Sequence, residues 1–261
     1  MRKLIVMLMA MVCAVAMLLT GCGGGEKKAA PAKEKVMKVA CEPTFAPFEF
    51  QKEGSKEFSG FDMDLIRAIG KQAGYKVEIS NMGFDALIPA LQAGNIDVVC
   101  SGMTITPERQ KAVDFSDPYY KSGLIILVNK DNKEIKSVAD LKGKKLGCQI
   151  GTTGEKKANS VGAAKVVSFN ANSEAVMELK NKGIDAIIND SPVVGYYLAQ
   201  GGGDKHAMTV GSVMEAEDYG IAVKKGNKQL LDDINKAMAE LKKNGEYDKI
   251  YKTWFGEAAK K

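Results

Sequence analysis

The sequence predicts an α/β protein with parallel sheets. Segments with the pattern of strands alternate with segments with the pattern of helices from residue 36 onward. The composition, 45% hydrophobic and 26% charged, is ordinary for a globular protein. Two extended segments, residues 114–120 and 216–220, interrupt the alternation. A chain of this length could form one large sheet or two lobes, and the two crossings favour a second lobe inserted into a discontinuous first lobe.

Residues 1–21 predict a signal peptide rather than part of the fold. A positively charged start precedes an apolar run at residues 4–19, which is short for a membrane span. The sequence Leu-Thr-Gly-Cys at residues 19–22 resembles the lipobox of bacterial lipoproteins. The alternative is a signal anchor with a chance cysteine. We expect lipidation of Cys22, with palmitate among the acyl chains, and a flexible tether over residues 22–35.

The net charge argues against a nucleic-acid-binding protein, and the hydropathy after Cys22 argues against a membrane-spanning one. Cleavage would remove Arg2 and Lys3 and lower the formal net charge from +5 to +3, which argues against a nucleic-acid surface. No segment after Cys22 is long and apolar enough to cross a bilayer. We therefore expect an extracytoplasmic protein, in the periplasm or at the cell surface, that a lipid anchors to the membrane.

Three cysteines, Cys41, Cys100 and Cys148, would remain unmodified in the mature chain. An odd count in an exported protein does not describe a disulfide framework. A bridge between Cys41 and Cys100 stays open, and buried free thiols are the favoured alternative. The chain has one histidine, His206, and no Cys-x-x-Cys, so we expect neither a metal site nor a cofactor.

The first lobe is expected to comprise residues 36–119 and 220–261. Phe61, Leu65 and Ile69 recur at intervals of four, which predicts an amphipathic helix. The other segments assigned to this lobe are strands at residues 36–40, 75–79 and 96–100 and helices at residues 61–73, 85–93, 227–244 and 246–255.

The second lobe is expected to comprise residues 120–219. Its strand patterns are short apolar or alternating runs, and its helix patterns lie between them. The predicted strands are residues 125–128, 146–149, 166–168 and 186–188, and the predicted helices are residues 154–160, 173–180 and 192–199.

Five motifs resemble those of bacterial solute-binding protein family 3, the polar amino acid receptors of ABC importers. They are Ala-Pro-Phe-Glu-Phe at 46–50, Gly-Phe-Asp-Met-Asp-Leu at 60–65, Ser-Gly-Met-Thr-Ile-Thr-Pro-Glu-Arg at 101–109, Asp-Phe-Ser-Asp-Pro-Tyr at 114–119 and Ile-Tyr-Lys-Thr-Trp-Phe-Gly at 250–256. The resemblance implies a type II periplasmic binding protein fold, in which two α/β lobes are joined by two hinge strands and close on a ligand. It also implies a permease as partner, and we expect a monomer.

A free amino acid needs a cation for its carboxylate, and Arg109 is the candidate. Its planar fork can donate two parallel hydrogen bonds, and by resemblance it matches the family's carboxylate-binding arginine. The alternative is an arginine on a helix surface near Glu108. Thr152 and Thr153 precede a predicted helix whose N–H groups favour an anion. By resemblance they contact the carboxylate from the second lobe, and the alternative is plain capping.

The ammonium group needs an anion, and Asp190 is the candidate. It follows the predicted strand 186–188, and strand carboxyl ends in open α/β sheets face the ligand crevice. The alternative is a helix start at Asn-Asp-Ser-Pro. Backbone carbonyls of Ser101 and Gly102 and the hydroxyl of Thr104 are expected to complete the ammonium site.

The side chain of the ligand is expected to lie between Phe45 and Phe84, which occupy family positions that flank it. The alternative is that both rings belong to the core. Glu42 and Gln149 are the expected selectivity residues. A carboxylate at Glu42 favours arginine, lysine or histidine, although the family's glutamine binders also carry an acid there, and Gln149 departs from the lysine associated with glutamine binders.

These features predict an extracytoplasmic receptor that binds a free polar L-amino acid, basic before glutamine, and delivers it to an ABC importer. One alternative is an enzyme like cyclohexadienyl or arogenate dehydratase, which needs a general acid, for which Glu42 is the only candidate. Another is a sensor-type receptor, which needs a membrane span and an output domain. The sequence between the second lobe and Lys261 has the pattern of neither a membrane span nor an output domain. A stand-alone binding protein without catalytic residues is therefore expected.

Overall fold

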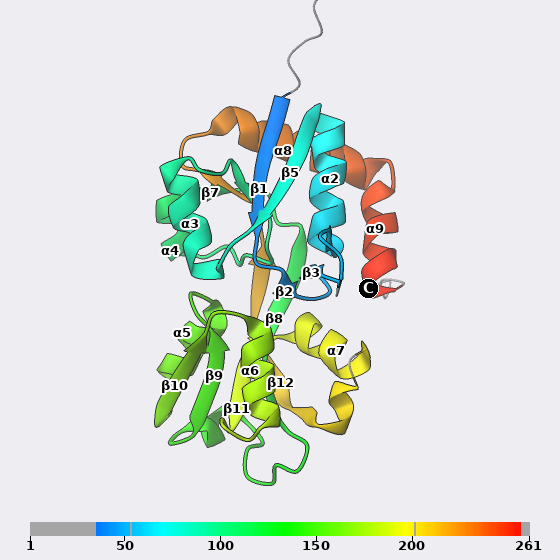
Figure 1. The fold of residues 1–261 in the computed structure, drawn as a ribbon. Helices are drawn as coiled ribbons and strands as arrows, with labels where there is room; N and C mark the ends of the chain where they lie inside the picture. The colour runs from blue at the N-terminus through cyan, green and yellow to red at the C-terminus, as the bar shows by residue number, and fades with distance from the viewer. Residues whose placement is uncertain (1–34, 53, 201, 257–261) are drawn as a thin grey trace, which may run out of the picture. The chain divides into compact units, whose positions relative to one another are not determined.

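Two five-stranded sheets form the framework of the protein in a computed structural model (Figure 1). The structure describes residues 35–52, 54–200 and 202–256, which lie in one compact unit of the chain. The signal peptide, Cys22 and nearly all of the tether lie outside the described residues. Because helices cover both sheets, the α/β class predicted from the sequence is confirmed.

The first sheet joins the start of the described chain to its C-terminal part. Its order is β5-β1-β6-β13-β7. Strand β1 (Lys35–Cys41) pairs in parallel with β5 (Tyr75–Asn81) and β6 (Val98–Val99). Strand β13 (Ala222–Lys224) runs antiparallel to β6 and β7 (Val113–Phe115). The sheet is therefore mixed, and the expectation of parallel sheets was wrong for this edge.

Helices cover both faces of the first sheet. On one face, α2 (Phe61–Ala73) packs against α8 (Lys228–Lys243) and α9 (Glu246–Phe255), and on the other lies α3 (Phe84–Ala93) (Figure 1). Phe61, Leu65 and Ile69 are fully buried, as their spacing predicts. Two additions were not predicted: the helix α4 (Pro107–Ala112) and a small sheet of β2 (Thr44–Phe45), β3 (Glu49–Gln51) and β4 (Phe58–Ser59).

The second sheet has the order β10-β9-β11-β8-β12. Strand β9 (Lys145–Gln149) pairs in parallel with β10 (Lys165–Phe169) and β11 (Ala186–Asp190), whereas β8 (Tyr120–Asn129) is antiparallel to β11 and β12 (Ala207–Tyr219). Its helical segments are η1 (Val138–Leu141), α5 (Thr153–Ser160), α6 (Asn172–Lys180), α7 (Ser191–Gln200) and η2 (Gly203–Lys205).

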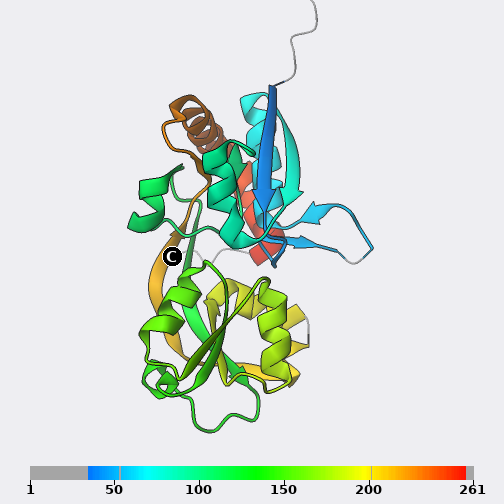
Figure 2. The same ribbon diagram turned by 60° about the vertical axis from the view of Figure 1, so that its left-hand side comes forward.

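Strands β8 and β12 connect the two sheets (Figure 2). They begin and end where the sequence shows its two interruptions, and Tyr120 pairs with Tyr219 at the end nearest the first sheet. The hydrogen bond from Tyr119 N to Tyr219 O (3.0 Å) continues the pairing into the first sheet. Strand β12 was not predicted, because its exposed half carries the polar and small residues of a loop. The predicted pair of hinge crossings is therefore a paired two-stranded ribbon.

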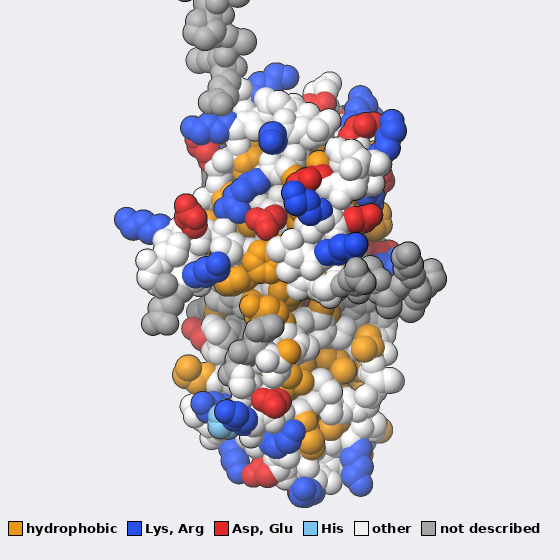
Figure 3. Space-filling view, turned by 90° about the vertical axis from the view of Figure 1, so that its right-hand side faces the viewer, with side chains coloured by type: hydrophobic (Ala, Val, Ile, Leu, Met, Phe, Trp, Pro, Cys, Tyr) orange, Lys and Arg blue, Asp and Glu red, His pale blue; other side chains and the backbone are white. Residues whose placement is uncertain are grey.

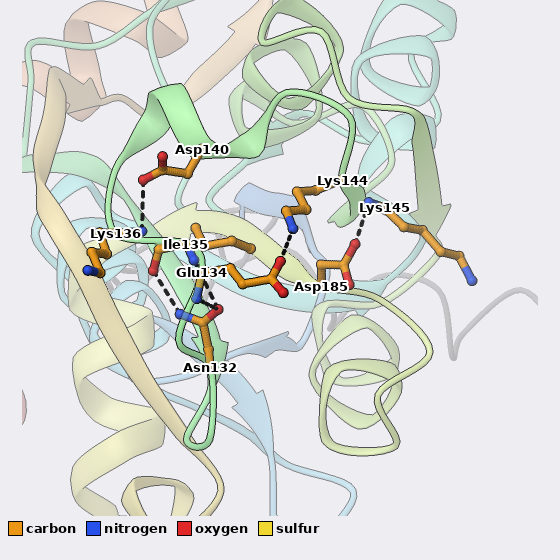
Figure 4. A network of polar contacts seen from close by, with 8 residues as sticks. All are labelled: Asn132, Glu134, Ile135, Lys136, Asp140, Lys144, Lys145 and Asp185. Carbon is orange, nitrogen blue, oxygen red and sulfur yellow. Dashed lines mark hydrogen bonds and ion pairs between the residues drawn. The ribbon is translucent and has the colours of Figure 1, made fainter.

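Polar contacts hold the turn that follows β8 at the far end of the second sheet (Figure 4). Asn132 Nδ2 donates to Ile135 O (2.7 Å), and its Oδ1 accepts from Ile135 N (3.1 Å). Lys144 forms an ion pair with Glu134 across the same region. These local side-chain contacts replace backbone pairing in the turn.

Cys41, Cys100 and Cys148 are buried free thiols. Strands β1 and β6 are neighbours, yet the Cys41 thiol contacts Met63 Sδ (3.8 Å) and the Cys100 thiol donates to Asp62 O (3.5 Å). Within the described part of the chain, no helix has the length and apolar character that crossing a bilayer requires.

Candidate functional site

A small cavity of about 10 Å³ lies between the two lobes. The first lobe contributes its walls from the ends of β1 and β6 and from α4, and the second lobe from the ends of β9 and β11. The cavity is lined by all of the predicted ligand contacts: Glu42, Phe45, Phe84, Ser101, Gly102, Thr104, Arg109, Gln149, Thr152, Thr153 and Asp190. Glu49, which was not predicted, also lines it. Their roles in binding stay predictions, but the structure brings them to one place.

The carboxyl ends of parallel strands explain this convergence. Glu42 follows β1, Ser101 and Gly102 follow β6, and Gln149 and Asp190 are the last residues of β9 and β11. Gly102 has a φ of 49°, and a Cβ there would lie 2.9 Å from the Phe45 ring. Only glycine combines this backbone with such close packing.

Arg109 joins the two lobes at one end of the cavity. Its backbone N–H is capped by Thr106, and its guanidinium donates to Thr104 O (2.8 Å) in the first lobe and Gly151 O (2.9 Å) in the second. The guanidinium lies 5.3 Å from the centre of the Phe84 ring. Burial lowers the Arg109 pKa, and the opposing charges of nearby carboxyl groups raise it. The side chain faces the cavity rather than a free helix surface.

The N-terminus of α5 lies opposite Arg109. Thr152 caps this helix by accepting from Glu155 N (3.1 Å), and its hydroxyl donates to Gln149 O (2.7 Å). Gly151 N, one residue before the cap, donates to the Glu155 carboxylate (2.7 Å). Thr152 therefore both caps α5 and lines the cavity, and the positive end of the helix dipole there favours an anion.

Asp190 is buried at the hinge side of the cavity. Its Oδ1 accepts from Ser122 Oγ (3.0 Å) and from the Tyr219 hydroxyl, so both connecting strands orient it. Tyr219 is itself fixed in a cluster of rings, 5.1 Å from Phe48 and 5.8 Å from Tyr120. Burial raises the pKa of Asp190 to about 7, and the negative charge of Glu217 adds to the effect.

The opposite end of the cavity is closed by side-chain contacts. Glu42 Oε2 accepts from Gln149 Nε2 (2.9 Å) and from Thr44 Oγ1 (2.7 Å). Gln149 Nε2 also donates to Asn170 O (3.1 Å). Burial raises the Glu42 pKa, whereas the bonds from Thr44 and Gln149 lower it.

The two aromatic walls lie in regular structure. Phe45 ends β2, and Phe84 is the first residue of α3. Phe45 is 7% exposed and packs with the core, so it serves both core and wall.

Glu217 was missed by sequence reasoning. This residue of β12 is 7% exposed, and its Oε2 accepts from Thr104 Oγ1 (3.2 Å) and Thr153 Oγ1 (3.2 Å). It therefore links one hydroxyl from each lobe. The sequence places it only in a polar segment at the second interruption, and the contact depends on how β12 crosses between the lobes.

His206 lies apart from the cavity. It lines a separate surface depression with five lysines, Lys130, Lys133, Lys180, Lys182 and Lys205, and one face of the protein shows the histidine beside basic side chains (Figure 3). Among the residues with assigned positions, no group of three or more His, Cys, Asp or Glu side chains could hold a metal ion.

Comparisons with known proteins agree with this architecture. The family model for bacterial extracellular solute-binding proteins, family 3, matches residues 37–257. A probable histidine-binding protein of Neisseria gonorrhoeae is 37% identical, covering 94% of this chain and 95% of its own. The arginine-binding extracellular protein ArtP of Bacillus subtilis is also 37% identical, covering 98% of both chains.

Solved structures give the same result. An ancestral arginine-binding protein with bound arginine is 51% identical, with a TM-score of 0.80, over 85% of this chain and 98% of its own. Its glutamine-bound counterpart is 49% identical, with a TM-score of 0.81, over 87% and 100%. The family match spans almost all of the described residues, and the chain therefore belongs to the bacterial extracellular solute-binding proteins, family 3.

Proposed function

We propose that the protein binds a free cationic L-amino acid, with arginine as the first candidate, and delivers it to the permease of an ABC importer. The balance of charge around the cavity carries this proposal. Of the predicted contacts, Arg109 supplies one positive charge, and Asp190 and Glu42 supply carboxylates at two separate places in the lining, which also contains the acid Glu49. A ligand with one carboxylate and two cationic groups neutralises all three, whereas glutamine leaves one buried carboxylate without a counter-charge.

The arrangement supports one orientation of the ligand. Its carboxylate would receive the Arg109 fork and the N–H groups at the start of α5. Its ammonium would meet Asp190, the Thr104 hydroxyl and the backbone carbonyls of Ser101 and Gly102. Its side chain would pass between Phe45 and Phe84 and reach Glu42 and Gln149.

The names of the relatives support a polar amino acid as the ligand, and they include more than one such amino acid. Their names refer to arginine and to histidine, and one solved structure holds arginine whereas its counterpart holds glutamine. Glutamine is therefore the competitor to exclude. Both curated relatives are named as binding proteins, which favours binding over the dehydratase alternative.

Lobe closure follows from the same geometry. We assign residues 36–119 and 220–261 to one lobe and residues 120–219 to the other. Arg109, the Glu42–Gln149 pair and Glu217 all bridge the lobes, and a ligand touching both walls adds contacts that exist only when the lobes are closed. Such a ligand shifts the population toward the closed form.

Delivery would occur outside the cytoplasm. A lipid on Cys22 and the tether up to residue 35 would hold the monomeric receptor near its permease. A ligand of about ten heavy atoms bound at about 1 μM needs roughly −8 kcal/mol, or about −0.8 kcal/mol per atom, which lies within the range that small ligands achieve.

A thermal-shift screen of the mature chain against the twenty amino acids tests the proposal, because a ligand that binds only the folded state raises the melting temperature. Arginine is expected to give the largest shift, followed by lysine or histidine and then glutamine. Calorimetry then measures the dissociation constants for arginine and glutamine. A glutamine affinity equal to or above that for arginine would remove the charge-balance argument, and no shift with any amino acid would remove the function.

A further inference from the structure

Two buried carboxyl oxygens lack a hydrogen-bond partner in the part of the chain that the structure describes: Glu49 Oε2 and Asp62 Oδ1. Glu49 is 1% exposed and Asp62 is fully buried. A buried acceptor without a donor is expensive, and a buried unpaired carboxylate is more so. Two such atoms on neighbouring residues require an explanation.

The other oxygen of each carboxyl group is fully engaged. Glu49 Oε1 accepts from Ser101 Oγ (2.9 Å). Asp62 Oδ2 accepts from Gly102 N (2.8 Å) and the Tyr119 hydroxyl (2.6 Å). The two carboxyl groups also lie within hydrogen-bonding reach of each other. The unpartnered oxygens Oε2 and Oδ1 are the atoms with unused capacity for such a contact.

Arg67, a cation on the same helix as Asp62, forms its ion pair with Asp64 and donates to Phe58 O rather than to either carboxyl group of the pair. The other titratable groups around the pair are Cys41 and Glu42 at and after the end of β1, Cys100 after β6, Tyr119 before β8, Asp190 at the end of β11 and Tyr247 in α9. All of these are acids or neutral. Burial raises the pKa of both Glu49 and Asp62, and in Glu49 the negative charge of Asp62 adds to this effect. Two carboxyl groups in such a place cannot both ionise.

We propose that Glu49 and Asp62 share one proton between Oε2 and Oδ1, and that this pair acts as a single unit that positions Ser101 and Gly102. One proton satisfies both unpartnered oxygens at once. The pair then carries one negative charge instead of two, and it holds the loop after β6 by a hydroxyl on one side and a backbone N–H on the other. In this proposal Asp62 and Glu49, although Glu49 also lines the cavity, act as positioning residues.

The consequence for binding rests on the proposed function. In that function the carbonyls of Ser101 and Gly102 receive the ligand's ammonium group, so their placement decides how well it is held. The loop contains Gly102 in a left-handed backbone conformation, and the hydrogen bond from Gly102 N to Asp62 holds it there. Loss of the shared proton at high pH would leave two adjacent buried charges and weaken both the fold and the site.

Infrared spectroscopy of the ligand-free protein at pH 8 tests the shared proton directly. The difference between the wild type and Glu49→Gln should contain the C=O stretching band of a protonated carboxylic acid, which ionised carboxylates lack. A difference between the wild type and Asp190→Asn, run at the same pH, controls for the other buried acid. Absence of the band in the first difference would overturn the proposal and would indicate a bridging water between two ionised groups.

Matched variants test the positioning role. In Glu49→Gln an amide N–H replaces the proton, so we expect arginine to bind within about threefold of the wild type and the alkaline fall of the melting temperature to lessen. Glu49→Met fills the space but offers neither the donor nor the acceptor, and we expect the dissociation constant for arginine to rise at least about tenfold. Equal affinity of the Met variant, or an unchanged alkaline profile in the Gln variant, would overturn the assignment. Because the infrared band needs no ligand, it separates this outcome from a failure of the proposed function.

Discussion

The two ends of the cavity are built by different means. Where the carboxylate of an amino acid would bind, the contacts use backbone groups: Arg109 donates to two carbonyls, and the start of α5 presents its N–H groups. Where the ligand side chain would bind, Glu42 and Gln149 meet side chain to side chain across the lobes. The first end depends on chain geometry, and the second can change with one substitution.

This difference explains how one fold can serve several amino acids. The main-chain groups of the ligand are common to every amino acid, and a site that rests on backbone geometry can remain unchanged. Selectivity then depends on the few side chains at the other end. Substitutions and pH changes at each end test this division.

Arg109→Ala should abolish the binding of every amino acid, with a loss of about a hundredfold or more, because the ligand carboxylate would be buried without its cation. The melting temperature of the free protein should change little, because Arg109 belongs to none of the hydrophobic core clusters of the described residues. Calorimetry and thermal unfolding measure the two quantities. Wild-type affinity in this variant would remove the assignment of this end.

Affinity should fall as the pH falls below about 7, by up to about tenfold per pH unit. Asp190 has a pKa of about 7 when the cavity is empty, and the ligand's ammonium lowers it, so binding at lower pH must expel a proton. The effect should be equal for all ligands, because it belongs to the common end. Calorimetry in buffers of different ionisation enthalpy measures the proton release, and Asp190→Asn should lack it.

The stability of the free protein should depend on pH in the opposite direction to the affinity. The Asp190 pKa is raised in the folded state above the ordinary value of about 3.9, so its contribution to the free energy of unfolding increases as the pH falls from about 8 toward 4. A pH series of thermal melts should show this rise in the wild type more strongly than in Asp190→Asn. Equal slopes would show that Asp190 is already ionised in the empty cavity.

Glu42→Gln should weaken arginine binding by about tenfold or more while changing glutamine binding by less than about threefold, because only a cationic side chain needs the charge. The amide keeps the size of the side chain and an acceptor for Thr44. Calorimetry with both ligands gives the ratio. A silent change, together with a preference for glutamine, would show that the two ends do not divide recognition as described.

Local sequence patterns determined much of what the structure contains. The spacing of Phe61, Leu65 and Ile69 predicted α2 with its bounds, since an interval of four places side chains on one helix face. The position of Asp190 at the end of a buried strand predicted that it would face the crevice, because parallel strands end at a common edge. The family motifs added Arg109, Phe45 and Phe84, which no periodicity identifies.

Pairings between distant segments were decided only by the tertiary structure. The antiparallel partners of β6, β8 and β11 depend on the route of the chain, which no local pattern records. For the same reason Glu217 could not be seen as a link between Thr104 and Thr153, because in the sequence it is an ordinary polar residue of the second interruption. The Glu49–Asp62 pair is a further case: two acids 13 positions apart in the sequence become one unit only when β3 and α2 bring their carboxyl groups together at buried positions.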